Sequence, residues 1–170
     1  EFQILIAAGV PAASAHLLSN HYNATRTEYY RQLARASDSG GDVVPFVVYA
    51  VQGFLDGLKE QVEEIWTQQW DMAWQNYIHE QFAGKSSETA VRQRRLVLDL
   101  AAQSSPVPKA KIPEISTRLA QAYAKCTDKT LARDLNALQD KGLVIKTREG
   151  YRARKELILA FRTPRVKIIS

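Results

Sequence analysis

The longest regular pattern of apolar positions in the chain runs from about Val43 to Phe82. Its apolar side chains return every three or four residues, the spacing of one helix face, and Gly53 and Gly57 interrupt it. A continuous helix of this span would be roughly 60 Å long. We therefore expect the helix to be broken once or to project between two domains. The repeating positions are Val47, Val51, Phe54, Leu58, Val62, Ile65, Trp66, Ala73 and Tyr77.

Three tryptophans stand out within this span. Trp66, Trp70 and Trp74 are spaced four residues apart, which places them on nearly one side of a helix. A stripe this wide is typical of a helix face that packs against other elements. We interpret the tryptophans as packing or interface residues rather than as a ligand cage.

The segment from Ala83 to Ser87 contains a glycine and two serines and is the predicted domain boundary. Residues 1–82 form the first predicted domain, with short helices ahead of the long one, and residues 83–170 form the second. Ser87 can cap a helix whose candidate core positions are Val91, Leu96, Leu98 and Leu100.

The second domain continues with two more predicted helices. One is opened by Pro113 and spans about 112–124, and the next begins near Lys129 behind a cap at Thr127 or Asp128. Gly142 is placed to end that helix in a left-handed conformation. Alternating residues then predict strands at 143–148 and 151–161 around the turn at Gly150. Three helices followed by a hairpin is the order of a winged helix-turn-helix, so the predicted fold is mainly α with one small β-hairpin.

Charge divides the chain at the same boundary. The net charge of the whole chain is +5. Residues 1–82 carry four basic and ten acidic residues, a charge of −6, whereas residues 83–170 carry 19 basic and 8 acidic residues, a charge of +11. A strongly basic module of this fold is a candidate for binding double-stranded DNA.

The third helix of the basic half has an inner face of Leu131, Leu135 and Leu138, which leaves polar residues on the outer face. Such a helix can enter the major groove, and wing cations can contact phosphates. The alternative is that these residues form only a solvated face and that the module serves protein contact or dimerisation, since Asp128, Asp134 and Asp140 dilute the positive charge. The candidate DNA-binding residues are Lys129, Thr130, Arg133 and Asn136 on the helix and Arg148, Arg152, Arg154 and Lys155 on the wing.

Two stretches of the first half suggest a family. Residues 5–33 (LIAAGVPAASAHLLSNHYNATRTEYYRQL) and 45–61 (PFVVYAVQGFLDGLKEQ) resemble the part of bacterial Fic-family proteins that follows the catalytic motif. Residues 130–144 (TLARDLNALQDKGLV) resemble the recognition helix and first wing strand of bacterial winged-helix regulators, and many Fic proteins continue into such a module. The resemblance implies that the chain is the C-terminal part of a Fic protein and that its first half packs behind a catalytic core.

The resemblance also implies what this chain lacks. Fic proteins typically transfer AMP from ATP to a protein hydroxyl through a His-Pro-Phe-x-x-Gly-Asn-Gly-Arg motif, which is absent here. None of the three histidines, His16, His21 and His79, is followed by the proline of this motif. No catalytic or ATP-binding position therefore carries over. We therefore expect no enzymatic activity and no cofactor in this chain, with ATP implied only for a full-length parent.

The remaining chemistry is sparse. The spacing of His16 and His21 gives poor convergence for a metal, and we expect no metal site. Cys126 is the single cysteine, so no internal disulfide can form and a reducing, cytoplasmic setting is expected. The apolar run near the start of the chain is too short and too interrupted for a membrane span, so we expect no membrane partner. A homodimer through the tryptophan face remains an alternative.

Overall fold

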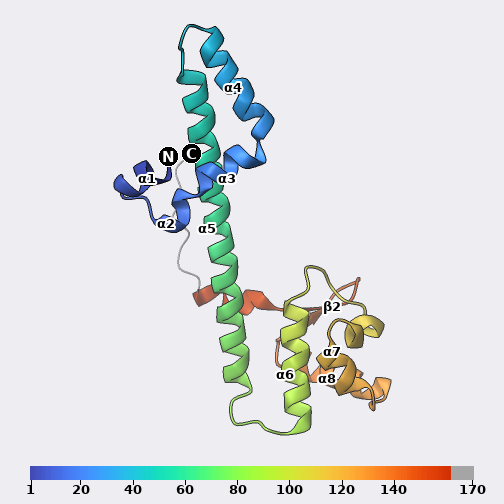
Figure 1. Cartoon of the computed structure of the whole chain (residues 1–170). Helices are drawn as coiled ribbons and strands as arrows, with labels where there is room; N and C mark the ends of the chain where they lie inside the picture. Colours follow the sequence, from blue (N-terminus) through green and yellow to red (C-terminus); the bar gives the residue numbers. More distant parts are fainter. Residues whose placement is uncertain (162–170) are drawn as a thin grey trace. The chain divides into compact units, whose positions relative to one another are not determined.

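A computed structural model of the chain describes residues 1–161 and is mainly helical, as predicted (Figure 1). The predicted strand and wing residues up to Phe161 fall within this range, and the last nine residues of the predicted second domain lie outside it. The chain divides into two compact units, Glu1–Gln68 and Gln69–Ser170. None of the described helices combines the length and apolarity needed to cross a membrane.

The first unit consists of four short helices and the beginning of a long one. The short helices are α1 (Phe2–Ala7), α2 (Ala12–Ala15), α3 (Leu17–Ala24) and α4 (Arg26–Asp38), and α5 (Val44–Gln81) contributes its residues up to Gln68. Gln61 ties α5 to α2, because its side chain accepts a hydrogen bond from Ser14 at 2.6 Å and donates one to the Ala13 carbonyl at 3.1 Å. Polar contacts therefore supplement a modest apolar interior.

Helix α5 is one unbroken helix of 38 residues that contributes to both units. Of the two predicted alternatives, the break is wrong, and a continuous helix that extends from one unit into the other is observed. The two glycines within it do not interrupt it because each faces a neighbouring helix closely. A Cβ on Gly53 would lie 2.1 Å from the His21 ring, and one on Gly57 would lie 3.3 Å from the Leu17 Cβ. Glycine lets α3 approach α5 at these positions, which compensates for its low helix propensity.

Aromatic rings fill the space between α3, α4 and α5. Tyr22 stacks on Tyr49 with ring centroids 6.0 Å apart and lies 4.9 Å from Tyr29. Phe46 lies within 6.2 Å of all three rings. The pKa of the Tyr22 hydroxyl is raised to about 12, mainly by burial and to a smaller extent by the negative charge of the nearby Glu1 carboxylate. The Thr25 and Tyr49 hydroxyls share a hydrogen bond.

The second unit contains the end of α5, three α-helices and a small sheet. The helices are α6 (Glu88–Ala101), α7 (Thr117–Tyr123) and α8 (Asp128–Asp140), with a 3₁₀-helix η1 (Lys109–Glu114) before α7. Strand β1 (Val144–Lys146) pairs antiparallel with β2 (Tyr151–Ala153), and η2 (Lys155–Phe161) follows. Val107 forms an isolated antiparallel bridge with Tyr151, through two backbone hydrogen bonds of 2.8 Å.

The core of the second unit includes the last turns of α5 and Phe82, the residue that directly follows the helix. Trp74, Ile78 and Phe82 are each at most 2% exposed and belong to the same hydrophobic cluster as Leu96 and Leu135. The two units accordingly divide within α5, earlier than the predicted boundary at Ala83. The predicted role of the tryptophan face as packing surface is confirmed for Trp74, and Trp70 packs against the same cluster.

Local capping explains where the helices of the second unit begin and end. Ser87 accepts the Ala90 N–H at 3.2 Å and caps α6, as predicted. Gly142 has a φ of +70°, and the N–H groups of Gly142 and Leu143 donate to the carbonyls of Gln139 and Leu138, which closes the end of α8. Thr127 is the N-cap of α8, although its side chain makes no capping hydrogen bond.

Two predicted elements differ from the structure. Pro113 does not open a helix of 112–124: it lies inside η1, and α7 begins only after Ser116, which caps it by accepting the Leu119 N–H. The second wing strand does not continue to Phe161. It ends at Ala153, because the apolar residues that follow are consecutive rather than alternating, and Ile158 within η2 is buried in the core.

Candidate nucleic-acid interface

Helix α8 has a buried inner face and a polar outer face, which are the two faces predicted from sequence. Leu131, Leu135 and Leu138 are at most 5% exposed. Lys129, Arg133 and Asn136 are exposed, and their spacing of four and three residues places them in one row on the outer side. Thr130 lies at the edge of this row, is half-buried, and its hydroxyl is 3.5 Å from that of Thr127.

In the sequence, Asp134 is one of the acidic residues that dilute the positive charge of this helix. In the structure it lies on the inner face of α8. The residue is 2% exposed and accepts hydrogen bonds from Arg92 Nε at 2.6 Å, Gln93 Nε2 at 3.0 Å and the Tyr123 hydroxyl at 3.0 Å. Its charge is therefore compensated inside the unit. The outer face of α8 is more positive than the sequence of the helix indicates.

The Asp134 cluster shifts the protonation of its partners. Burial, together with the negative charge of Asp134, raises the pKa of the Tyr123 hydroxyl above its ordinary value. The hydrogen bond to Asp134 raises the pKa of the Arg92 guanidinium, against the opposing effect of burial. Both donors are protonated at neutral pH, and the shifts extend this protonation to higher pH, so donors from α6 and α7 hold the carboxylate.

A second carboxylate connects α6 to α7. Asp99 accepts hydrogen bonds from Ser116 Oγ at 2.6 Å and from Arg118 Nε at 2.9 Å, and a second guanidinium nitrogen of Arg118 also bonds to it. Because Ser116 also caps α7, one serine joins the helix start to α6. Together the two carboxylates fix the helices that support α8.

The sequence interpretation missed these supporting residues. The signal for Asp134 was present: it lies between Leu131 and Leu135 at a spacing that belongs to the inner face of the helix. No comparable signal in the sequence pairs it with Arg92 or Tyr123, because those contacts join separate helices.

The β1–β2 hairpin, which the sequence predicts to be a wing, is shorter than predicted, and its cations divide into two groups. Arg148 lies exposed in the turn between β1 and β2, and Arg154 is exposed just after β2. Arg152 instead pairs with Glu156, and Lys155 pairs with Asp71 at 2.7 Å. Burial opposes ionisation of Glu156, but a backbone hydrogen bond and Arg152 outweigh it and lower the pKa of that carboxyl. Arg152 and Lys155 are consequently less available to a phosphate than Arg148 and Arg154.

Gly150 fixes the turn between β1 and β2 against the rest of the unit. Its φ is +150°, and a Cβ there would lie 2.3 Å from the carbonyl of Val107. The carbonyl of Gly150 accepts the Thr147 N–H at 2.7 Å. Close backbone approach at this glycine therefore holds Arg148 at a defined end of the small sheet.

No protein-family model, no curated protein and no solved structure matches the chain. The interpretation of this surface therefore rests on the chemistry and geometry of its own residues. Within residues 1–161 no group of three or more histidine, cysteine or acidic residues is arranged to hold a metal ion.

Proposed function

We propose that the second unit is a winged helix-turn-helix module that binds double-stranded DNA, with α8 as the helix that enters the major groove. Its elements follow one another as α6, α7, α8 and the β1–β2 hairpin, and the bridge from Val107 to Tyr151 adds a third short segment to the sheet. This order and the short connection between α7 and α8 are typical of that motif.

The observation that carries the proposal is the outer face of α8. Lys129 at the start of the helix, with Arg133 and Asn136 along it, presents donors suited to guanine and adenine edges, while Asp134 is withdrawn into the interior. Exposed Arg148 and Arg154 would contact phosphates on either side of the groove. Arg152 and Lys155 would contribute less because each already has a carboxylate partner.

A fluorescence-anisotropy titration with a labelled duplex tests this proposal. We expect binding at low salt that weakens as salt rises, and we expect Lys129→Ala/Arg133→Ala to weaken it by at least about tenfold because two charged contacts are lost. The matched control is Arg26→Ala/Arg35→Ala, which removes the same charge from exposed positions of the first unit. Equal losses in both variants, or no binding by the wild type at low salt, would rule out α8 as a specific DNA-reading helix.

A second proposal concerns the first unit: it corresponds to the helices that follow the catalytic motif in a Fic-family protein and packs against a catalytic core. The observation that favours a protein partner is a row of exposed apolar side chains on α5, opposite its contact with α3. We call this row the α5 apolar face. Its members are 39–64% exposed and comprise Val44, Val47, Val48, Val51 and Leu55. Contiguous exposed apolar residues of this kind mark interaction surfaces. The parent's catalytic core, with ATP as its substrate, is the partner that the family resemblance implies.

Sedimentation velocity tests the α5 apolar face. We expect the wild type to associate as its concentration rises and Val48→Asp/Val51→Asp to remain monomeric, because two charges would have to be buried. The control Gln68→Asp/Gln69→Asp adds the same charge at exposed polar positions of the same helix and should behave as the wild type. A single stable dimer would favour homodimerisation through the α5 apolar face rather than through the tryptophan face, whereas open-ended association would favour a face that another domain covers. A wild type that is monomeric at every concentration and binds no hydrophobic dye would contradict the proposal.

A further inference from the structure

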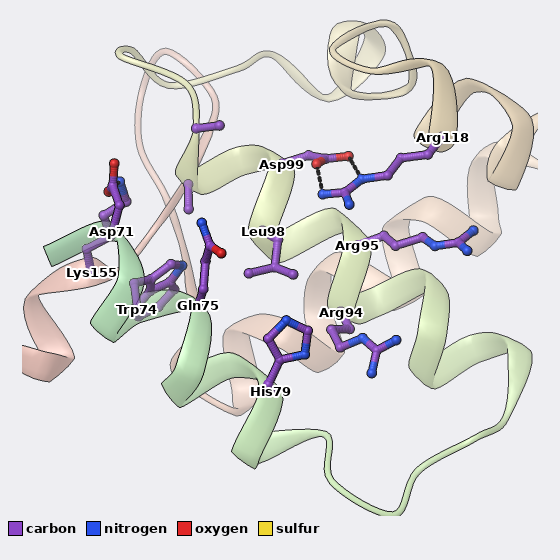
Figure 2. A pocket seen from close by; sticks show the side chains of 12 residues that line it. Asp71, Trp74, Gln75, His79, Arg94, Arg95, Leu98, Asp99, Arg118 and Lys155 are labelled. Atoms are coloured by element: carbon purple, nitrogen blue, oxygen red, sulfur yellow. Dashed lines mark hydrogen bonds and ion pairs between the residues drawn. The ribbon is translucent and has the colours of Figure 1, made fainter. Parts of the chain in front are cut away.

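The second unit contains a cleft between the end of α5 and α6 that the DNA-binding proposal does not use (Figure 2). Its volume is about 390 Å³, within the range of small-molecule sites. Helix α5 supplies one wall, including Trp74, Gln75 and His79, and α6 supplies the other, including Arg94 and Arg95. On α6, Arg92 and Gln93 bond to Asp134 of α8, so α8 packs against a different side of that helix.

The cleft has an excess of positive charge. Its two carboxylates, Asp71 and Asp99, are already paired with Lys155 and Arg118. Arg94 and Arg95 have no hydrogen-bond or ion-pair partner among the described residues. Figure 2 draws both extending from α6 without a dashed line to any neighbour. Two guanidinium groups therefore remain in the cleft without a counter-charge.

A buried donor also lies in the wall of the cleft. Trp74 is 1% exposed, and its indole Nε1–H has no acceptor among the described residues. An unsatisfied buried donor is costly, so native structures rarely leave one without a partner. Among the residues that line the cleft, Trp74 thus lacks an acceptor while the two arginines lack an anion.

We propose that this cleft binds a small molecule that carries a phosphate group. A phosphate offers two charges and several acceptor oxygens, which suits two guanidinium groups in bidentate contact. A ring N–H of His79 and the amide of Gln75 are further donors on the opposite wall. The site is independent of DNA binding by α8, so either proposal can fail without the other.

Nuclear magnetic resonance of the full chain, with glucose 6-phosphate as the probe, tests the proposal. We expect a saturable shift of the Trp74 indole N–H signal, which Trp66→Phe and Trp70→Phe identify by elimination. Uncharged glucose should cause no shift, and inorganic phosphate should produce the same shift at higher concentration if the phosphate group is what is recognised.

Arginine variants separate a specific site from general attraction of anions. Arg94→Gln/Arg95→Gln should weaken glucose 6-phosphate binding by at least about tenfold, because charge-assisted hydrogen bonds are lost. Arg133→Gln/Arg148→Gln removes the same charge from the α8 and wing surface and should leave the affinity unchanged. No saturable shift in the wild type, or equal weakening in the two double variants, would overturn the proposal.

Discussion

Replacing Asp134 with alanine is expected to lower the free energy of unfolding of the second unit by about 3–5 kcal/mol, the range for removing one partner of a buried charged pair. The carboxylate is 2% exposed and is the common acceptor of Arg92, Gln93 and Tyr123. Its removal would leave the Arg92 charge without a counter-ion and the Tyr123 hydroxyl without an acceptor. Urea denaturation monitored by circular dichroism measures the effect.

Two further variants define the cause. Asp140→Ala removes a carboxylate from an exposed position near the end of the same helix and should change the free energy of unfolding by no more than about 0.5 kcal/mol. Asp134→Asn keeps an acceptor oxygen but removes the charge, so its loss of stability should fall between those of the two alanine variants. If Asp134→Ala and Asp140→Ala were equally stable, the buried cluster would not support α8.

The same variant bears on DNA binding indirectly. Asp134 lies on the face of α8 that packs against α6 and α7, so it has no direct part in the proposed contact with bases. Any loss of DNA affinity in Asp134→Ala should therefore follow the fraction of unfolded protein. Loss of affinity in Lys129→Ala/Arg133→Ala should occur with the fold intact, because both side chains are exposed.

Local rules predict α8 well. The leucine spacing identifies its inner face, and Gly142 ends it through hydrogen bonds that involve only neighbouring residues. The polar residues Lys129, Arg133 and Asn136 are exposed for the same reason: a helix with a leucine-rich inner face leaves its other side to solvent. These features depend on spacing within one element, which the sequence contains directly.

Features that depend on contacts between distant elements could not be predicted in this way. Gly84 and the change in charge sign are strong signals for a linker, and they place the predicted boundary at Ala83. They contain no information about the packing of Trp74, Ile78 and Phe82, which belong to the core of the second unit. Similarly, Arg94 and His79 meet in one cleft although no pattern in the sequence relates them. The predicted second strand was too long because the apolar residues after Ala153 have strand propensity. In the structure Ile158 lies in η2 and is buried in the core.

The position of the boundary leads to the largest effect that we expect. A fragment of residues 69–170 should fold cooperatively, whereas a fragment of residues 83–170 should not, because it lacks three side chains of its hydrophobic core. Truncation of large buried residues costs about 2–5 kcal/mol each. Loss of three such side chains therefore approaches the total stability of a small domain, about 5–15 kcal/mol. Thermal denaturation followed by near-ultraviolet circular dichroism would distinguish the two fragments.

A control in the 69–170 fragment itself shows whether the side chains or the extra helical residues cause the difference. The 69–170 fragment with Trp74→Ala, Ile78→Ala and Phe82→Ala retains good helix formers in the last turns of α5 but removes their contribution to the core. We expect it to behave as the 83–170 fragment does, without a cooperative transition. The exposed positions Gln75 and Glu80 provide the matched comparison, since Gln75→Ala/Glu80→Ala should unfold as the unaltered 69–170 fragment does. A cooperative transition in the 83–170 fragment at an unchanged temperature would show that the end of α5 is not part of this core and would restore the boundary at Ala83.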